Sequence, residues 1–196
     1  MAALNAPDLE NPIHGLTMTK SRFTWKDIKS ELKELTPDDL LGIIGDLYDL
    51  NEDNRRFLHV RYARSDESLK SYKDIIRKAV CPTLEKGQDL NLSAGRKAIS
   101  DYRKAVGHPK DMLELMVYYV ECGNEFTLTY GDIDEPFYNS LVSMFSDIVS
   151  RLTKAQDEYL LHVFIPRLQN VVRKANDIGW GYYDAIADLL ADLEKR

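Results

Sequence analysis

Apolar residues recur at intervals of three and four along most of the chain, and this spacing predicts α-helices. The first periodic stretch runs from Trp25 to Leu35, and Thr24 is the expected cap at its start. A second begins at Thr36, where a capping residue, a proline and two acids mark a helix N-terminus. Its apolar positions lie between residues 40 and 48.

The same spacing predicts seven further helices, so about nine are expected. They begin near residues 51–53, 65, 93, 109, 137 and 154 and after a break at 176–179. Gly123 is expected to end the helix that starts near 109, and Pro166 is expected to kink the eighth. No segment alternates with a period of two, so the fold class is all-α, built of successive antiparallel αα-hairpins.

The hairpins follow one another at a spacing typical of helical-repeat proteins, but no residue pattern recurs at a fixed period. A helical-repeat-like superhelix and a compact multi-helix array therefore both remain open. The segment MLELMVYYV (112–120) is apolar nearly all round, which predicts a central, buried helix. Residues 1–19 have two prolines and no sustained period, so we expect a flexible leader followed by a single all-helical domain over 20–196.

The composition is that of an ordinary globular protein, with 44% hydrophobic and 30% charged residues. The longest uncharged run, residues 136–146, is far shorter than the roughly 20 residues that a transmembrane helix needs. The first residues also lack a basic region followed by an apolar one. We therefore expect no membrane association, and a cytoplasmic protein in which Cys81 and Cys122 are free thiols.

Charge is distributed unevenly along the chain, whose net charge is −6. Residues 20–110 carry 19 Lys and Arg against 15 Asp and Glu, whereas residues 111–196 carry 7 against 15. The bases cluster within residues 55–64, 73–78 and 96–104, but acids lie among them. Nucleic-acid binding is therefore not favoured, and ion pairs between the basic and the acidic half are the expected role of these residues.

The motifs of several enzyme classes are missing from the sequence. It contains no HExxH, no CxxC pair, no Gly-x-Ser-x-Gly, no phosphate-binding loop and no GxGxxG. The four histidines are scattered. The sequence therefore predicts neither a cofactor nor a metal site, and it leaves open whether the protein is an enzyme.

The stretch EFTLTYGDIDEPFYNS (125–140) and the acid one turn before it are the best candidate for a site. The candidate residues are Glu121, Glu125, Tyr130, Asp132 and Asp134. If the chain folds back, these carboxylates can gather and bind a ligand or a hard cation. One of them can also act as a general base. The spacing does not fit an EF-hand, because Phe137 stands where glycine is needed. A structural explanation is also open, since Asp134-Glu135-Pro136 has the pattern of a helix start.

Four segments carry a resemblance to a known family: WKDIKSELKEL (25–35), RKAISDYRKAVGHP (96–109), YYVECGNEFTLTYGDIDEPFYNSLVSMF (118–145) and DIGWGYYD (177–184). The chain resembles a family of small all-helical proteins, mainly bacterial, that is described as a domain of unknown function. The resemblance covers most of residues 20–190. It implies an all-helical fold, and it implies no particular activity or site residue.

Two functional hypotheses follow from these patterns. The first is a non-enzymatic helical module that binds another protein, supported by the string of hairpins, the uneven charge and the missing catalytic motifs. The second is a small-ligand- or metal-binding protein, or an enzyme, that uses a carboxylate and tyrosine cluster within residues 121–138. The sequence leaves the oligomeric state open.

Overall fold

The computed structural model describes residues 24–63 and 66–195, so the predicted leader lies outside the described residues. Within these two ranges the chain forms nine α-helices and one short 3₁₀ turn, and no strand, which confirms the all-α prediction. None of the described helices is both long and apolar enough to cross a bilayer. The helices are α1 (Trp25–Leu32), α2 (Pro37–Leu50), α3 (Glu52–Ala63), α4 (Asp66–Val80), α5 (Leu92–Ala105), α6 (Pro109–Tyr130), α7 (Glu135–Ala155), α8 (Glu158–Lys174) and α9 (Tyr182–Glu194), and the 3₁₀ turn η1 is Leu84–Lys86.

The chain divides into two compact units, Met1–Gly45 and Asp46–Arg196. The single domain expected over 20–196 therefore stays a prediction. In the first unit the expected caps are present: Thr24 and Asp27 form a capping box at the start of α1. Thr36 and Asp39 bond to each other in the same reciprocal way at the start of α2.

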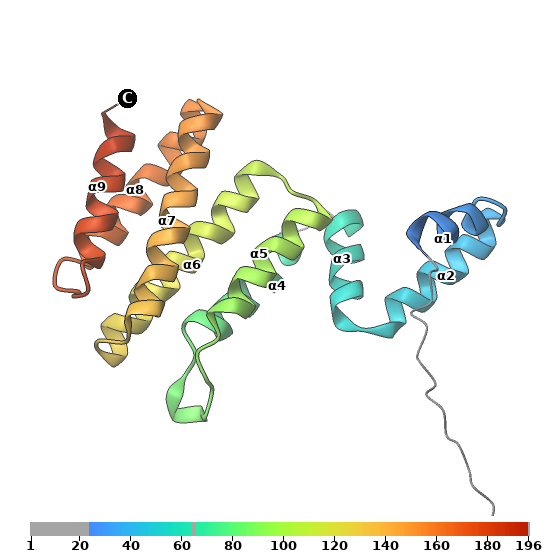
Figure 1. The fold of residues 1–196 in the computed structure, drawn as a ribbon, viewed down its shortest axis with the longest axis horizontal. Helices are drawn as coiled ribbons and strands as arrows, with labels where there is room; N and C mark the ends of the chain where they lie inside the picture. Colours follow the sequence, from blue (N-terminus) through green and yellow to red (C-terminus); the bar gives the residue numbers. More distant parts are fainter. Residues whose placement is uncertain (1–23, 64–65, 196) are drawn as a thin grey trace, which may run out of the picture. The chain divides into compact units, whose positions relative to one another are not determined.

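The helices of the second unit lie in two layers. Helices α4, α6 and α8 lie side by side in one layer, where α6 packs against both of the others (Figure 1). Helix α3 packs against both α4 and α5. Helices α5, α7 and α9 make up the other layer, and each of them packs on the helix that precedes it in the chain. Arg96 of α5 joins the middle of that layer, because its guanidinium donates to the carbonyl oxygen of Ser140 on α7 at 2.7 Å.

Helix α6 is the centre of this unit, as the apolar run 112–120 predicted. It packs against α4, α5, α7 and α8, and more than half of its residues are buried. The prediction that Gly123 ends this helix is wrong, since α6 continues for two more turns to Tyr130. Gly123 is needed for packing: a Cβ atom placed on it would lie 2.4 Å from Cδ2 of Leu141, a fully buried residue of α7. The glycine therefore lets α7 approach α6 closely.

Three other predicted boundaries are shifted, in each case by side-chain hydrogen bonding or backbone geometry. Helix α5, expected to begin near residue 93, begins at Leu92, because the carboxamide oxygen of Asn91 accepts from the N–H of Ala94 at 3.0 Å and caps it. Helix α7 runs on to Ala155, and the chain turns at Gln156, whose φ is 48°. Asp157 then caps α8, which contains Pro166 in its interior.

Replacing Gly123 with alanine tests the close approach of α6 and α7. The added methyl group meets the side chain of Leu141 in a filled core, so we expect Gly123→Ala to lower the free energy of unfolding by about 1–3 kcal/mol. Ser143→Ala, at an exposed position of α7, should change it by less than about 0.5 kcal/mol. Urea unfolding followed by circular dichroism measures both, and equal stability of the two variants would contradict the packing role.

Candidate functional site

Three glutamates lie in a row along one face of α6. Glu114, Glu121 and Glu125 are spaced by seven and four residues, and this spacing places them on one side of a helix. The neighbouring helices supply the cations: α4 contributes Lys73 and Arg77, and α8 contributes Arg167. We call these six residues the ion-paired face.

The pairs of the ion-paired face link all three helices of the layer. Lys73 Nζ lies 2.6 Å from Glu114 Oε1, and Arg167 binds the other oxygen of the same carboxylate. Arg167 also donates two parallel hydrogen bonds to Glu121, from Nε at 2.8 Å and from Nη2 at 2.7 Å. A bidentate guanidinium–carboxylate pair fixes orientation as well as distance.

Arg77 and Glu125 form the remaining pair of the face, and both guanidinium Nη atoms donate to the carboxylate. This pair joins α4 to α6 further along the same glutamate row. Because Lys73, Arg77, Glu114 and Glu125 come from opposite halves of the chain, these contacts confirm the predicted ion pairs between the basic and the acidic half.

The electrostatics of the face hold the carboxylates of Glu114 and Glu125 in the charged form. Burial raises the pKa of Glu114, but the hydrogen bond from Lys73 and the charge of Arg167 outweigh it, and the net pKa is lowered. Hydrogen bonds from Arg77 lower the pKa of Glu125. Burial lowers the pKa of Arg167, but the bonds to Glu121 more than compensate and the pKa is raised. The carboxylates of Glu114 and Glu125 are therefore ionised at neutral pH and unsuited to act as a general acid or base.

The thiols beside this face are held in the neutral form. Both are free, as predicted, with Cys122 buried and Cys81 half-buried. Burial raises the pKa of Cys122 to about 11, although Arg77 opposes the shift. Burial also raises the pKa of Cys81, and that of Tyr118 to about 12. Since the thiolate is the nucleophilic form, neither cysteine is activated for covalent chemistry.

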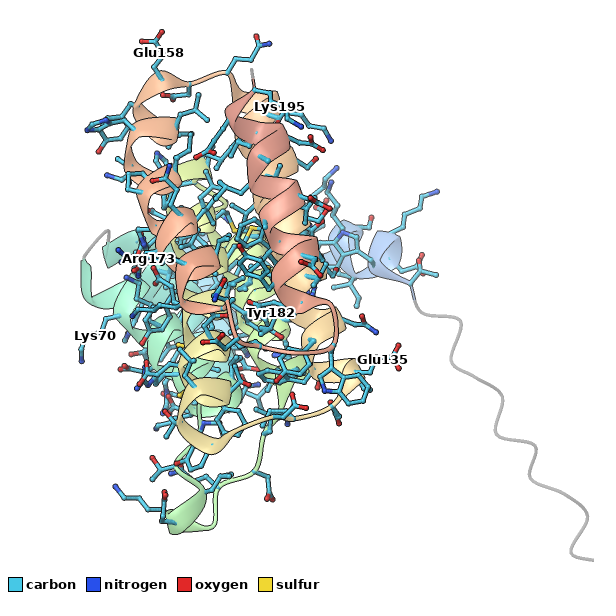
Figure 2. All side chains as sticks on the ribbon, turned by 90° about the vertical axis from the view of Figure 1, so that its left-hand side faces the viewer. Lys70, Glu135, Glu158, Arg173, Tyr182 and Lys195 are labelled. Atoms are coloured by element: carbon cyan, nitrogen blue, oxygen red, sulfur yellow. The ribbon has the colours of Figure 1, made fainter. Side chains whose placement is uncertain are left out.

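A groove of 280 Å³ opens between α6 and α8 at the end of the ion-paired face. Leu128 is 53% exposed there, and Lys174 takes part in no ion pair within the described part of the chain. Figure 2 labels Arg173, the neighbour of Lys174 in the last turn of α8. The groove thus combines an exposed apolar side chain with a lysine that has no salt-bridge contact among the described residues, although its charge helps to lower the pKa of nearby Glu125. Its lining residues are Glu121, Asn124, Glu125, Leu128, Thr129, Asn170, Val171 and Lys174.

The five residues predicted as a site are divided among separate partners. Glu121 and Glu125 are brought together, since both belong to the ion-paired face and both line the groove. Tyr130 is the last residue of α6, and its hydroxyl donates to Glu85 of η1 at 3.0 Å. Asp134 is the N-cap of α7 and accepts from the N–H of Phe137 at 2.8 Å, which confirms the predicted helix start.

Asp132 has partners that its sequence neighbourhood did not indicate. One carboxylate oxygen accepts from the hydroxyl of Tyr138 at 2.8 Å, and the other accepts from Nε1 of Trp180 at 2.8 Å. Trp180 is 56% exposed, and its indole N–H is the group that binds the carboxylate of Asp132. Asp132 therefore joins the turn before α7 to the turn before α9.

A buried hydrogen-bonded pair lies behind the groove. Asn124 of α6 accepts from the hydroxyl of Tyr182 at 2.6 Å and donates to the carbonyl oxygen of Val171 on α8 at 2.9 Å. Tyr182 lies at the first turn of α9, where Figure 2 labels it. Tyr182 is buried, whereas the next residue, Tyr183, is half-buried. The pair links α6, α8 and α9 through two side chains that are almost fully buried.

Sequence reasoning missed Glu114, Arg167 and Lys73 as members of one network. The sequence indicated part of this network, because Lys73 and Arg77 belong to a cluster of basic residues with helical spacing. No sequence pattern indicated the pairing with α8, since the residues next to Arg167 in the sequence are uncharged. Among the described residues no group of three or more His, Cys, Asp or Glu side chains has the arrangement of a metal site.

Comparison with known proteins adds no match: no family model fits the chain, and neither a curated protein nor a solved structure is similar to it. The resemblance to an all-helical family therefore stays a prediction.

The lowered pKa of Glu114 predicts how stability depends on pH. A carboxyl whose pKa is lowered in the folded state stabilises the fold above its unfolded value of 4.5, and this contribution is lost as the pH falls through the folded pKa. We expect Glu114→Gln to be less stable than the wild type at pH 7 and the difference to shrink below about pH 4.5. Urea unfolding at pH 7, 5, 4 and 3 measures it. A difference that does not change with pH would show that the charge of Glu114 is irrelevant.

The Asn124–Tyr182 pair can be tested with a matched tyrosine. Tyr182→Phe leaves the buried oxygen of Asn124 without its donor, so we expect a loss of about 1–3 kcal/mol in the free energy of unfolding. Tyr183→Phe, on the next residue and half-buried, should cost less than about 0.5 kcal/mol. Guanidinium unfolding of the two variants decides the matter, and a loss in Tyr183→Phe as large as in Tyr182→Phe would argue against a specific bond.

Proposed function

We propose that this protein is a non-enzymatic helical module that binds another protein, and that the groove between α6 and α8 is where it binds. The observation that carries the proposal is the combination, in one groove, of exposed Leu128 and unpaired Lys174 beside side chains held by ion pairs. The expected partner is a protein segment with an apolar residue to cover Leu128 and an acidic residue to pair with Lys174.

Pre-organisation supports this assignment. The bidentate bonds from Arg167 to Glu121 and from Arg77 to Glu125 hold one wall of the groove in place before any partner arrives. A partner then orders few side chains on binding, and the entropy cost that opposes association is smaller. The same ion pairs neutralise the two carboxylates, so the unpaired charge at the groove is the positive charge of Lys174.

The chemistry of the groups also favours binding over catalysis. The carboxylates of Glu114 and Glu125 have lowered pKa values, and the thiols of Cys81 and Cys122 have raised ones. A general acid or base needs a pKa near the working pH, and a nucleophilic thiol needs a lowered one. These groups depart from both requirements.

A small ligand in the same groove is the second candidate. Two members of the predicted cluster, Glu121 and Glu125, line it, and its volume of 280 Å³ is just below the usual range of small-molecule sites. A ligand of this kind would have to displace Arg77 or Arg167, or bind without using the carboxylates. This requirement makes a protein segment the better fit.

Affinity capture with groove variants tests the proposed function. The tagged full-length chain is incubated with native cell extract, and retained proteins are identified by mass spectrometry. We expect Leu128→Asp and Lys174→Glu to reduce the retained partner by about tenfold or more, equivalent to at least about 1.4 kcal/mol of binding free energy. Leu128 is exposed, so the substitution leaves the core intact.

Lys154→Glu is the matched control, because it reverses one exposed charge on α7 outside the groove and should retain the partner as the wild type does. Metal analysis and a thermal-shift ligand screen of the purified wild type run in parallel. Equal retention by wild type and both groove variants would remove the groove from the function. A wild type that retains no protein but binds a small ligand would establish the second candidate.

A further inference from the structure

Helix α1 and the part of α2 that belongs to the first unit expose apolar side chains that a folded protein normally buries. Helices α1 and α2 are described throughout, and neither has a buried residue. Six large apolar side chains between residues 25 and 44 are exposed by between 37% and 67%. We call this set the α1–α2 apolar surface: Trp25, Ile28, Leu35, Leu41, Ile43 and Ile44.

Leu35 lies in the turn between α1 and α2, and the other five residues lie on one side of their helix. Trp25, Ile28 and Leu32 repeat at intervals of three and four on α1, and the apolar residues of α2 occupy one half of its circumference. The acids of α2, which include Asp38 and Asp39, lie on the opposite half. Helices of 8 and 14 residues have little stability in water without tertiary packing. Another apolar surface must therefore pack against this side.

We propose that two copies of this chain associate through the α1–α2 apolar surface, so that four short helices enclose a shared core. Two amphipathic helices from each copy are the number from which a four-helix bundle is built. A two-fold axis makes such an interface self-complementary, because the same surface is presented by both copies.

The available area fits this occupant. A standard stable interface covers about 800 Å² on each partner, of which roughly 500 Å² is apolar. Six large apolar side chains with the exposures of the α1–α2 apolar surface present area of that order. Nothing beyond a second copy is needed to reach the size of a stable dimer.

The charges on the two helices also fit a second copy. Lys26, Lys29 and Lys33 follow one edge of the apolar stripe of α1, whereas α2 has acids and no base. The acids lie on the half of α2 that is opposite its apolar side, so the charged residues of both helices stay outside the apolar core of the interface and form its polar rim.

Sedimentation of the full-length chain tests the association. We expect the wild type to sediment at twice the chain mass of 22.5 kDa, and the double variant Leu41→Asp/Ile44→Asp to sediment at the chain mass, with at least a tenfold weaker association. Val106→Asp is the matched control, because Val106 of the second unit has the same 44% exposure as Ile44, and it should sediment as the wild type does. A double variant that still sediments as a dimer overturns the proposal.

Hydrogen exchange provides a second readout that needs no variant. On dilution of the wild type below its dissociation constant, we expect the amides of α1 and α2 to lose protection while those of α6 keep theirs. A wild type that is monomeric at all concentrations overturns the proposal, as does protection of α1 and α2 that is independent of concentration. The latter result would mean that the surface is covered within one chain.

Discussion

The burial of α6 on several sides is the constraint on which the second unit depends. This helix packs against α4, α5, α7 and α8, and the more than half of its residues that are buried are mostly apolar or small. Gly123 is the extreme case, because the side chain of Leu141 occupies the space that a Cβ atom would take. The one stripe of α6 that remains polar carries the glutamates, and the adjacent helices must then supply the cations.

The ion-paired face is a consequence of that arrangement and has its own energetics. Moving charges out of water costs free energy that their mutual attraction only partly returns, so such pairs stabilise a fold modestly while removal of one partner is costly. Arg167 is an example, since its guanidinium binds both Glu114 and Glu121, so that each carboxylate is paired with a cation. What the network supplies is geometry: side chains from three helices are held at defined positions beside the groove.

Much of the fold was accessible from local patterns. Helical spacing, the caps at Thr24, Thr36 and Asp134, and the buried character of residues 112–120 are properties of short stretches, and the structure confirms each of them. Gly123 was misinterpreted for the same reason. A glycine that ends a helix and one that admits a neighbouring helix look alike in sequence, and only the position of Leu141 distinguishes them.

The candidate site depends on contacts between residues that are far apart in the chain. The sequence by itself determined the helices, their polar and apolar sides, and the separation of charge into a basic and an acidic half. Only the tertiary structure decided that Glu121 meets Arg167, that Glu125 meets Arg77 and that Asp132 meets Trp180. The physical reason is range: periodicity and capping act within a few residues, whereas the partner of a charge is set by which helices the core brings side by side.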